Sequence, residues 1–349
     1  MDLDKKIVIN MLSSADKVEG QGVGSAYLEQ VNLVKEGASD LFTVEINSGK
    51  KADIIHSHTI DPQNYLKMKN NKNANVCYVH FLPDTLNGSI QLPKALFSVF
   101  KKYVISFYKT ADYLIVVNPI FMEELEKYGI AREKMIYIPN YVSKEQFYVK
   151  PVEQRNAIRE QYGIKADEFV VIGVGQVQTR KGVLDFVDVA KKLPDVRFVW
   201  CGGFSFGKIT DGYEELKVVE NPPANVQFPG IIPRSDMNDI YNMADVLFMP
   251  SYNELFPMAI LEAVNLHRPM VLRSLKLYED ILFKKYQMAD DNDSFAELIR
   301  KLHEDPAYYA RCAADSAYIS EYYSKENVLS IWKEFYTRVY EELQERKRG

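Results

Sequence analysis

Short apolar runs alternate with longer amphipathic segments along this chain, and the alternation constrains the fold more than any other feature. The first set of apolar runs comprises KIVINML, DIIHSH, NVCYVHF and DYLIVVN, with stretches such as SAYLEQVNLVKEG and PIFMEELEKYG between them. Buried strands separated by helices predict a parallel, doubly wound sheet. The chain is therefore expected to belong to the α/β class.

The same alternation begins again after a break. The segment MIYIPNYVSKEQFYVKPVEQRN contains two prolines and reads as a linker around residues 140 to 155. Beyond it come the apolar runs FVVIGVGQV, VRFVWCGG, NVQFPG, DVLFMPS and PMVLRS. A chain of 349 residues suits two domains. We expect two Rossmann-like domains facing across a cleft, over residues 1–148 and 149–322, with ligands at the carboxyl ends of the strands.

The last segment predicts a long helix from Lys325 to Arg346. Its apolar side chains recur at spacings of three and four residues, which is the pattern of a helix with one buried face. We expect residues 323–349 to cross back and pack on the first domain through Val328, Ile331, Trp332, Phe335, Tyr336, Val339 and Leu343.

Composition excludes several classes of protein. The net charge of -5 argues against a general nucleic-acid binder, which is usually basic over a whole domain. Cys77, Cys201 and Cys312 are far apart and form no CxxC pattern, which fits a reducing, cytoplasmic setting. Cys77 and Cys201 lie in apolar runs, so we expect these two to be buried thiols. No apolar window is long enough to span a bilayer. Any membrane contact is therefore expected to be peripheral.

The segment SYNELFPMAILEA, residues 251 to 263, gives the strongest functional signal. Glu254 lies in a loop after a predicted strand, and Glu262 lies in the helix that begins near Pro257. Helical spacing separates the two carboxylates by roughly 10 Å, which suits the two ends of one extended ligand. The helix start also offers free N–H groups to an anion. The spacing alone is equally that of ordinary surface or capping acids.

This segment resembles the E-x7-E motif of retaining GT-B glycosyltransferases. The resemblance implies that Glu254 lies by the donor sugar and that Glu262 binds the ribose hydroxyls. It also implies that the backbone of Leu255, Phe256 and Pro257 contacts sugar and phosphate. The family more often has Gly-Phe-Gly at these three positions, and Pro257 has no N–H to donate.

Two loops are similar to phosphate-binding loops of the same family. GVGQVQTRKG resembles a G-R-x(3-4)-K-G loop, which implies that Lys181 and Arg180 hold the donor diphosphate, with Gln176 where arginine is usual. A solvated basic loop is the alternative. EGQGVGSAY follows the first strand, and its Gly22 and Gly24 are expected to approach the pyrophosphate. Glycine turns of this kind are common, so this second loop is weak evidence by itself.

Two further segments resemble the family. His80 ends the strand YVHF, where the family often has a histidine near the transferred sugar, and we expect a catalytic role for it beside Glu254 and Lys181. His56 and His58 also lie at a strand end, although buried structural histidines are the more common case. YIPNYVSKEQF resembles an interdomain segment with Tyr141 in place of glycine.

The segment QLPKALFSVFKKYVISFYKTA predicts a basic amphipathic helix over residues 91 to 111. Its apolar face is predicted to carry Leu92, Leu96, Val99, Phe100, Tyr103 and Phe107. Basic helices with aromatic residues bind anionic membrane surfaces, and a helix packed on the core with solvated lysines is the alternative. We expect the membrane contact to involve Lys94, Phe97, Phe100, Lys101, Lys102, Phe107 and Lys109.

Together these motifs are similar to those of bacterial glycolipid synthases, the α-galactosyl-glucosyl-diacylglycerol synthases in particular. The resemblance implies retaining transfer of a hexose from UDP-galactose or UDP-glucose to α-monoglucosyl-diacylglycerol on the inner face of the cell membrane. It implies no cofactor, no essential metal and no nucleic-acid partner. A soluble acceptor, an inverting or epimerising GT-B relative and a non-enzymatic sensor or scaffold remain alternatives.

Overall fold

The computed structural model describes residues 6–14, 22–80, 82–83, 94–204, 213–254 and 256–348. The chain forms two compact units, one made of Met1–Tyr141 with Ser324–Gly349 and the other of Val142–Tyr323. Sequence analysis placed the first boundary after residue 148. The structure places it earlier because the N–H groups of Tyr148 and Lys150 donate hydrogen bonds to the side chains of Asn238 and Asn242 in the second unit.

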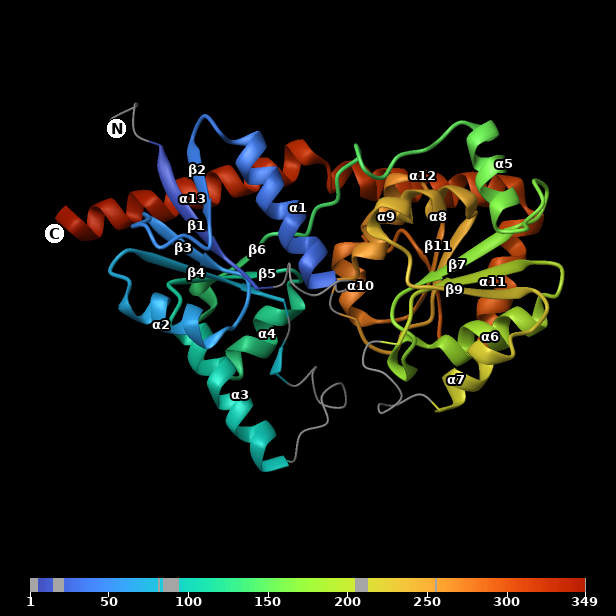
Figure 1. Cartoon of the computed structure of the whole chain (residues 1–349), viewed down its shortest axis with the longest axis horizontal. Coiled ribbons are helices and arrows are strands. Elements are labelled where there is room, and N and C mark those ends of the chain that lie inside the picture. The colour runs from blue at the N-terminus through green and yellow to red at the C-terminus, as the bar shows by residue number, and fades with distance from the viewer. Residues whose placement is uncertain are drawn as a thin grey trace. The chain divides into compact units, whose positions relative to one another are not determined.

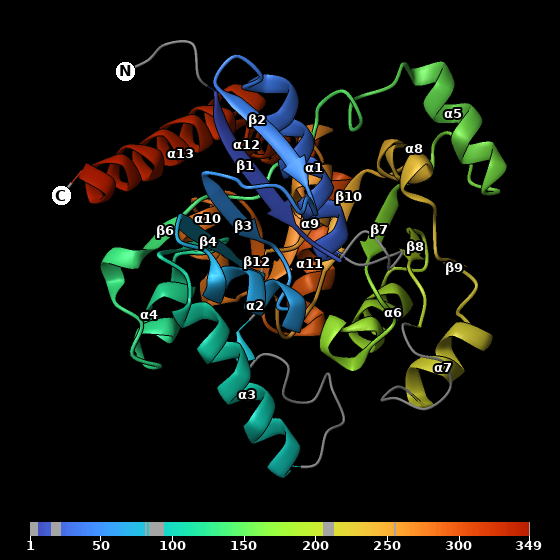
Figure 2. The same ribbon diagram turned by 60° about the vertical axis from the view of Figure 1, so that its left-hand side comes forward.

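In the described part of the first unit, six parallel strands form one sheet in the order β2-β1-β3-β4-β5-β6. The strands are β1 (Ile7–Leu12), β2 (Phe42–Ile46), β3 (Ile54–Ser57), β4 (Ala74–Val79), β5 (Tyr113–Val116) and β6 (Met135–Tyr137). The helices are α1 (Gly22–Gly37), α2 (Pro62–Asn70), α3 (Lys94–Lys109), α4 (Ile120–Glu126) and α13 (Lys325–Arg348). α1 and α13 pack together on one face, while α2, α3 and α4 cover the other (Figures 1 and 2).

The C-terminal helix α13 belongs to the first unit because its apolar stripe is buried there. Of the predicted stripe only Ile331 is half-buried, and the other six residues are buried. The Trp332 ring lies 5.7 Å from that of His56 on β3, and the Tyr336 ring lies 5.6 Å from that of Phe42 on β2. At Gly37 of α1, a Cβ atom would lie 2.5 Å from the Leu329 side chain. The small residue therefore lets α1 and α13 approach closely.

The second unit repeats the architecture, with six parallel strands in the order β12-β11-β10-β7-β8-β9 among its described residues. The strands are β7 (Val170–Val174), β8 (Arg197–Cys201), β9 (Val226–Gly230), β10 (Val246–Met249), β11 (Met270–Arg273) and β12 (Gln287–Ala289). The helices are α5 (Val152–Gln161), α6 (Val183–Lys192), α7 (Tyr213–Glu220), α8 (Met237–Met243), α9 (Met258–Asn265), α10 (Lys276–Ile281), α11 (Asn292–Glu304) and α12 (Pro306–Tyr322).

The strand order reverses between β7 and β10, and this reversal divides the helices of the second unit between the two faces of its sheet. Right-handed crossovers that progress toward one edge of a parallel sheet place their helices on one face of the sheet. Crossovers that progress toward the other edge place their helices on the opposite face. α6 accordingly packs with α7 and α11, whereas α9 packs with α8 and α12 (Figures 1 and 2). The reversal point lies at the carboxyl ends of β7 and β10, where open α/β sheets bind ligands.

The predicted linker contains more regular structure than its composition indicated. Residues 135–137 form the edge strand β6, and α5 begins at Val152, so the extended segment covers only residues 138–151. α5 is anchored by two arginines: Arg155 and Arg159 both pair with Asp245, the latter at 2.8 Å. Arg159 is buried and also donates to the carbonyl oxygens of Met243, Ala166 and Glu168. A tertiary ion-pair network therefore holds a helix whose sequence is mostly polar.

The two predicted buried thiols, Cys77 on β4 and Cys201 on β8, are confirmed as free and buried. Cys312 on α12 is also free and buried. Burial raises the pKa of Cys201 to about 12, so this thiol stays protonated at neutral pH. Within the described ranges, no helix is long and apolar enough to cross a bilayer.

Candidate active site

The predicted phosphate loop lies between β7 and α6 and ends in the short 3-10 helix Thr179–Lys181. Gly182 follows in a left-handed backbone conformation with φ of 71°. A Cβ atom there would lie 2.5 Å from the carbonyl oxygen of Pro250. Because only glycine tolerates both constraints, this residue lets the loop approach the segment that follows β10.

This approach pairs Lys181 with Glu254. The Lys181 ammonium contacts Glu254 Oε1, although the two residues are 73 positions apart in the sequence. Lys181 is 9% exposed and Glu254 is 7% exposed. Burial lowers the pKa of Lys181, the Glu254 carboxylate opposes that shift, and Arg180 adds to it. The structure thus brings together two of the three predicted catalytic residues as a buried ion pair.

The other predicted residues of the phosphate loop form a chain of hydrogen bonds. Gln176 Oε1 accepts from Gln178 Nε2 at 2.8 Å, and Gln178 Oε1 accepts from Arg180 Nε at 3.0 Å. Arg180 Nη1 also donates to the carbonyl oxygen of Asn253 at 3.3 Å. Gln176 therefore acts on Arg180 through Gln178, a residue that sequence analysis did not single out. The half-buried guanidinium is held next to the Lys181–Glu254 pair.

Glu262 lies on α9, is 4% exposed and has two partners that the sequence did not predict. Its Oε1 accepts from Arg234 Nη1 at 2.7 Å, and its Oε2 accepts from the Tyr241 hydroxyl at 2.6 Å. The Arg234 guanidinium in turn lies 5.1 Å from the centre of the Phe147 ring. The carboxylate is therefore fixed in orientation, and each oxygen still has a lone pair for another donor.

The segment between the two glutamates enters α9 as expected. Pro257 is the N-cap residue, with an extended backbone, and α9 begins at Met258. The Phe256 side chain is buried and its ring lies 5.6 Å from that of Tyr323. Any contact of Phe256 with a ligand must therefore come from its backbone. Leu255 lies outside the described residues.

Arg273, the last residue of β11, fixes the loop that leads to Glu254. Its Nε donates to the carbonyl oxygen of Pro250 at 2.9 Å, and its guanidinium lies 4.0 Å from the centre of the Tyr252 ring. It also lies 3.3 Å from the Asp185 carboxylate. Arg273 was not among the predicted site residues. An arginine at the end of an apolar strand is the sequence feature that could have pointed to it. At the carboxyl edge of this sheet, the cations and carboxylates together suit an anionic ligand that carries hydroxyl groups.

The predicted site residues of the first unit lie at the carboxyl edge of its own sheet. Gly22 and Gly24 begin α1, where the first N–H groups of a helix are free to bind an anion. His56 lies on β3, His58 follows it, and His80 follows β4. All three histidines are buried.

The three histidines form an aromatic stack with Tyr78. The ring centroids of His56 and His58 are 4.3 Å apart, and those of Tyr78 and His80 are 4.4 Å apart. The Tyr336 hydroxyl accepts from Gln30 Nε2 at 3.1 Å and shares a hydrogen bond of 2.6 Å with His56 Nδ1. The other ring nitrogen of His56, Nε2, has no hydrogen-bond partner in the described chain.

Burial keeps this histidine stack neutral. It lowers the pKa of both His56 and His80 to about 3, and it lowers the pKa of His58 well below 6.5. Interactions among the three rings lower the pKa values of His56 and His58 further. Because burial lowers its pKa, His80 is neutral at physiological pH in this structure.

Acid is expected to destabilise the first unit because of this stack. The folded pKa values lie below the unfolded value of 6.5, so the unfolded chain binds more protons between pH 6.5 and about 3. The free energy of unfolding should fall by about 1 kcal/mol per histidine for each pH unit below 6.5. Denaturant unfolding at pH 7.5 and 5.5 measures this, with Trp332 as the reporter in a Trp200→Phe background.

The His58→Phe variant separates the stack from other acid effects, since its loss of stability on acidification should be smaller. His303→Asn, which changes a half-buried histidine of α11, serves as the control and should keep the full loss. An unchanged slope in His58→Phe would contradict the assignment.

Helix α3 divides its predicted apolar face between the core and the surface. Of that face, Phe107 is buried near the C-terminal end, whereas Leu96 is 56% exposed and Val99 is 66% exposed. Val104 and Tyr108, which were not predicted on this face, are buried near Phe107 in the sequence. The Lys94 end of α3 stands clear of the sheet of its unit in both views (Figures 1 and 2). The N-terminal half of α3 thus presents exposed apolar side chains, and the exposed Lys102 follows directly after it.

The structure corrects part of the predicted membrane set. Phe107 is wholly buried, so it packs in the core and faces no membrane. The Lys101 ammonium lies 4.9 Å from the centre of the Tyr128 ring, and Phe97 and Phe100 are half-buried. Lys102 and Lys109 are exposed, and the side chain of Lys94 lies outside the described residues. A helical wheel cannot show which end of an apolar stripe the sheet covers.

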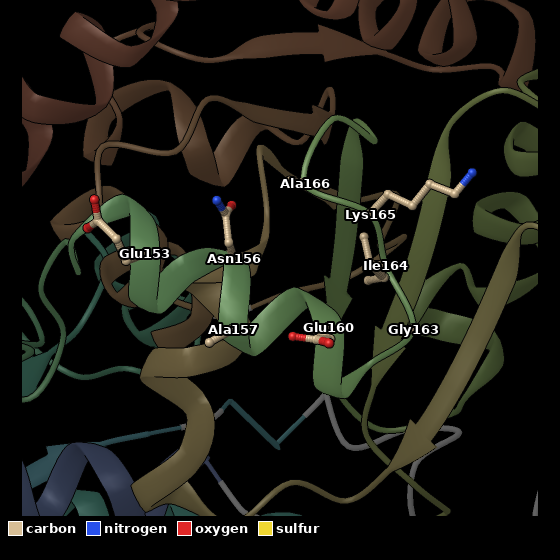
Figure 3. Close-up of a pocket in the computed structure, with 8 residues that line it drawn as sticks. All are labelled: Glu153, Asn156, Ala157, Glu160, Gly163, Ile164, Lys165 and Ala166. Atoms are coloured by element: carbon tan, nitrogen blue, oxygen red, sulfur yellow. The ribbon is translucent and has the colours of Figure 1, made fainter.

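A hollow of about 540 Å³ on the second unit is lined by none of the candidate site residues of that unit. α5 and the turn after it line the hollow, and the side chains of Glu160 and Lys165 diverge from each other (Figure 3). None of its lining residues was predicted as a site residue. Among the side chains that the structure describes, no group of three or more His, Cys, Asp or Glu residues is arranged to hold a metal ion.

Comparison with known proteins gives the family. Residues 154–317 match the family described as glycosyl transferases group 1, and residues 41–146 match glycosyltransferase family 4. The chain is 45% identical, over 96% of its length and 90% of the relative, to an alpha-galactosylglucosyldiacylglycerol synthase of Streptococcus pneumoniae. It is 28% identical, over 81% of its length and 84% of the relative, to a processive diacylglycerol alpha-glucosyltransferase of Acholeplasma laidlawii.

Solved structures agree on the fold. The Anabaena protein HepE in complex with UDP and glucose superimposes with a TM-score of 0.75 at 15% identity, covering 94% of this chain and 99% of that one. Sucrose-phosphate synthase of Thermosynechococcus elongatus gives a TM-score of 0.77 at 17% identity, covering 96% and 99%. Both units, the parallel sheets and the returning C-terminal helix fit this architecture. The chain therefore belongs to the GT-B glycosyltransferases of the group 1 and family 4 type.

Proposed function

We propose that this enzyme transfers a hexose, with galactose favoured, from a UDP-sugar to α-monoglucosyl-diacylglycerol with retention of configuration. The observation that carries the proposal is the buried Lys181–Glu254 pair at the switch point of the second sheet, in a chain 45% identical to a synthase of this kind. UDP is the nucleotide named in the complex of the structural neighbour HepE. UDP-glucose as donor and a soluble acceptor are the competing proposals.

Each site residue has a role in this proposal. Lys181 and Arg180 neutralise the diphosphate as charge develops on it, which preorganised cations do efficiently. Glu254 lies by the hexose, and Glu262, fixed by Arg234 and Tyr241, accepts from the ribose hydroxyls. The bond from the anomeric carbon to the UDP oxygen breaks while the bond to the acceptor oxygen forms on the same face. The acceptor proton passes to the departing diphosphate.

A transfer assay tests the proposal directly. Radiolabelled UDP-galactose and UDP-glucose are supplied separately with monoglucosyl-diacylglycerol in anionic vesicles, and products are separated by thin-layer chromatography. One new, slower-migrating glycolipid with galactose supports the proposal, and its anomeric configuration tests retention. The same product with glucose alone favours the competing donor. No lipid product, with UDP released onto a soluble sugar, would reject the lipid acceptor.

We propose that the two protein cations carry the charge of the diphosphate without a resident metal. The support is that Lys181 and Arg180 lie side by side at the loop after β7. Adding EDTA to the assay should therefore leave the transfer rate within about twofold, since the two protein cations already neutralise the diphosphate. A loss of activity that Mg²⁺ or Mn²⁺ restores would contradict this.

We propose further that the enzyme attaches peripherally to the cytoplasmic membrane face through the N-terminal half of α3. Leu96 and Val99 are exposed there beside Lys102, which suits a shallow contact with anionic headgroups. Lys102→Glu changes two unit charges, each worth about 1 kcal/mol at an anionic surface, so vesicle binding should weaken about 30-fold. Co-sedimentation with anionic vesicles measures this, and Lys165→Glu, at an exposed lysine of the second unit, is the matched control.

Neutral vesicles provide a further comparison. Binding of the unmodified chain should be much weaker to them, and the two variants should then behave alike. Equal binding of Lys102→Glu and Lys165→Glu to anionic vesicles would remove α3 from the membrane contact.

A further inference from the structure

A tyrosine that no motif includes lies near Glu254. Tyr278 is on α10, directly after β11, and β11 pairs with β10, the strand that leads to Glu254. The Tyr323 ring packs on Phe256, and the Tyr323 hydroxyl donates to the carbonyl oxygen of Ile281 at 2.7 Å. These contacts hold α10 against the segment that carries Glu254.

The Tyr278 hydroxyl is buried and has no hydrogen-bond partner in the described parts of the chain. Burial raises the pKa of this phenol well above 10, and the nearby Glu254 carboxylate raises it further. A buried donor without a partner costs about 1 to 3 kcal/mol, and a hydrogen bond formed in another state of the site would offset this cost.

The ion pair between Lys181 and Glu254 indicates which acceptor the Tyr278 hydroxyl would bind. In this structure the Lys181 ammonium donates to Glu254 Oε1. A diphosphate attracts the same ammonium, and a buried carboxylate that loses its cation is destabilised unless another donor replaces it. Tyr278 supplies a buried O–H on the neighbouring element.

We infer that Tyr278 is a positioning residue that hydrogen-bonds Glu254 when the donor diphosphate draws Lys181 away. Glu254 thus exchanges a cation for a neutral phenol and remains an ionised acceptor for the donor sugar. The inference rests on the proposed function, in which Lys181 binds the diphosphate. It also predicts that the hydroxyl contributes only in the ligand-bound state.

Calorimetric titration of Tyr278→Phe with UDP and with uridine tests the exchange. UDP should bind about tenfold more weakly to the variant, because Glu254 then lacks a replacement donor, whereas uridine affinity should change less than twofold. The melting temperature without ligand should not fall, since the removed hydroxyl has no partner there. Tyr286→Phe, which removes a phenol whose ring lies 5.9 Å from that of Tyr278, is the control and should bind UDP normally.

A double-mutant cycle with Glu254→Gln identifies the residue through which Tyr278 acts. In the Glu254→Gln background, Tyr278→Phe should no longer weaken UDP binding. Unchanged UDP affinity in Tyr278→Phe, an equal loss for uridine, or full additivity with Glu254→Gln would each overturn the inference. If the unmodified enzyme binds UDP no more tightly than uridine, Lys181 does not hold a diphosphate, and the proposed function falls together with the inference.

Discussion

Replacing Lys181 by methionine is expected to lower kcat/KM for the UDP-sugar by about 100- to 1,000-fold, the cost of removing one preorganised charge-stabilising group. Methionine keeps much of the length and volume of the side chain, so the change removes mainly the charge. The ammonium is buried against Glu254, where the low dielectric strengthens its interaction with a diphosphate. Steady-state kinetics with varied UDP-sugar measures the loss.

The same change should also destabilise the second unit, because Glu254 becomes a buried charge without its cation. A cost of about 3 kcal/mol is expected for Lys181→Met, and most of it should be recovered in the Lys181→Met/Glu254→Gln double variant. Activity should stay low in the double variant. This contrast separates a role in the reaction from a role in folding. Lys192→Met, at an exposed lysine paired with Asp293, is the control and should retain full activity.

Arg159→Leu is expected to lower the free energy of unfolding of the second unit by about 3 to 5 kcal/mol, the cost of breaking a buried ion pair. The guanidinium is buried, pairs with Asp245 at 2.8 Å and satisfies three carbonyl oxygens of the surrounding chain. Leucine fills part of the space but leaves all four acceptors without this donor.

Denaturant unfolding in a Trp332→Phe background measures this cost, because Trp200 then reports on the second unit alone. Arg300→Leu changes a half-exposed arginine paired with Glu304 and should cost less than about 1 kcal/mol. If Arg159→Leu costs no more than Arg300→Leu, the Asp245 network does not anchor α5. The two variants differ mainly in burial, so the comparison isolates that contribution.

Local pattern was sufficient for the fold, and motif resemblance supplied several site residues. Apolar runs with turn residues at their carboxyl ends predicted the central strands of both sheets, because strands buried on both faces are almost wholly apolar. The edge strands β2, β6 and β12 were missed because they are short and only partly buried. The first part of α5 was read as linker because its sequence is polar. Resemblance to the family's motifs, and not spacing alone, implied Lys181, Glu254 and Glu262, and the structure places the first two in contact.

The sequence by itself determined which segments are buried and which residue types lie at the carboxyl ends of the strands. Only the tertiary structure decided the partners: Arg234 and Tyr241 for Glu262, the Arg273 contact with Pro250, and the division of α3 into a packed half and an exposed half. Periodicity predicts that a side chain packs against another helix or strand, but the crossover connections decide which helix or strand that is. Polar contacts between segments far apart in the sequence therefore leave little trace in local pattern.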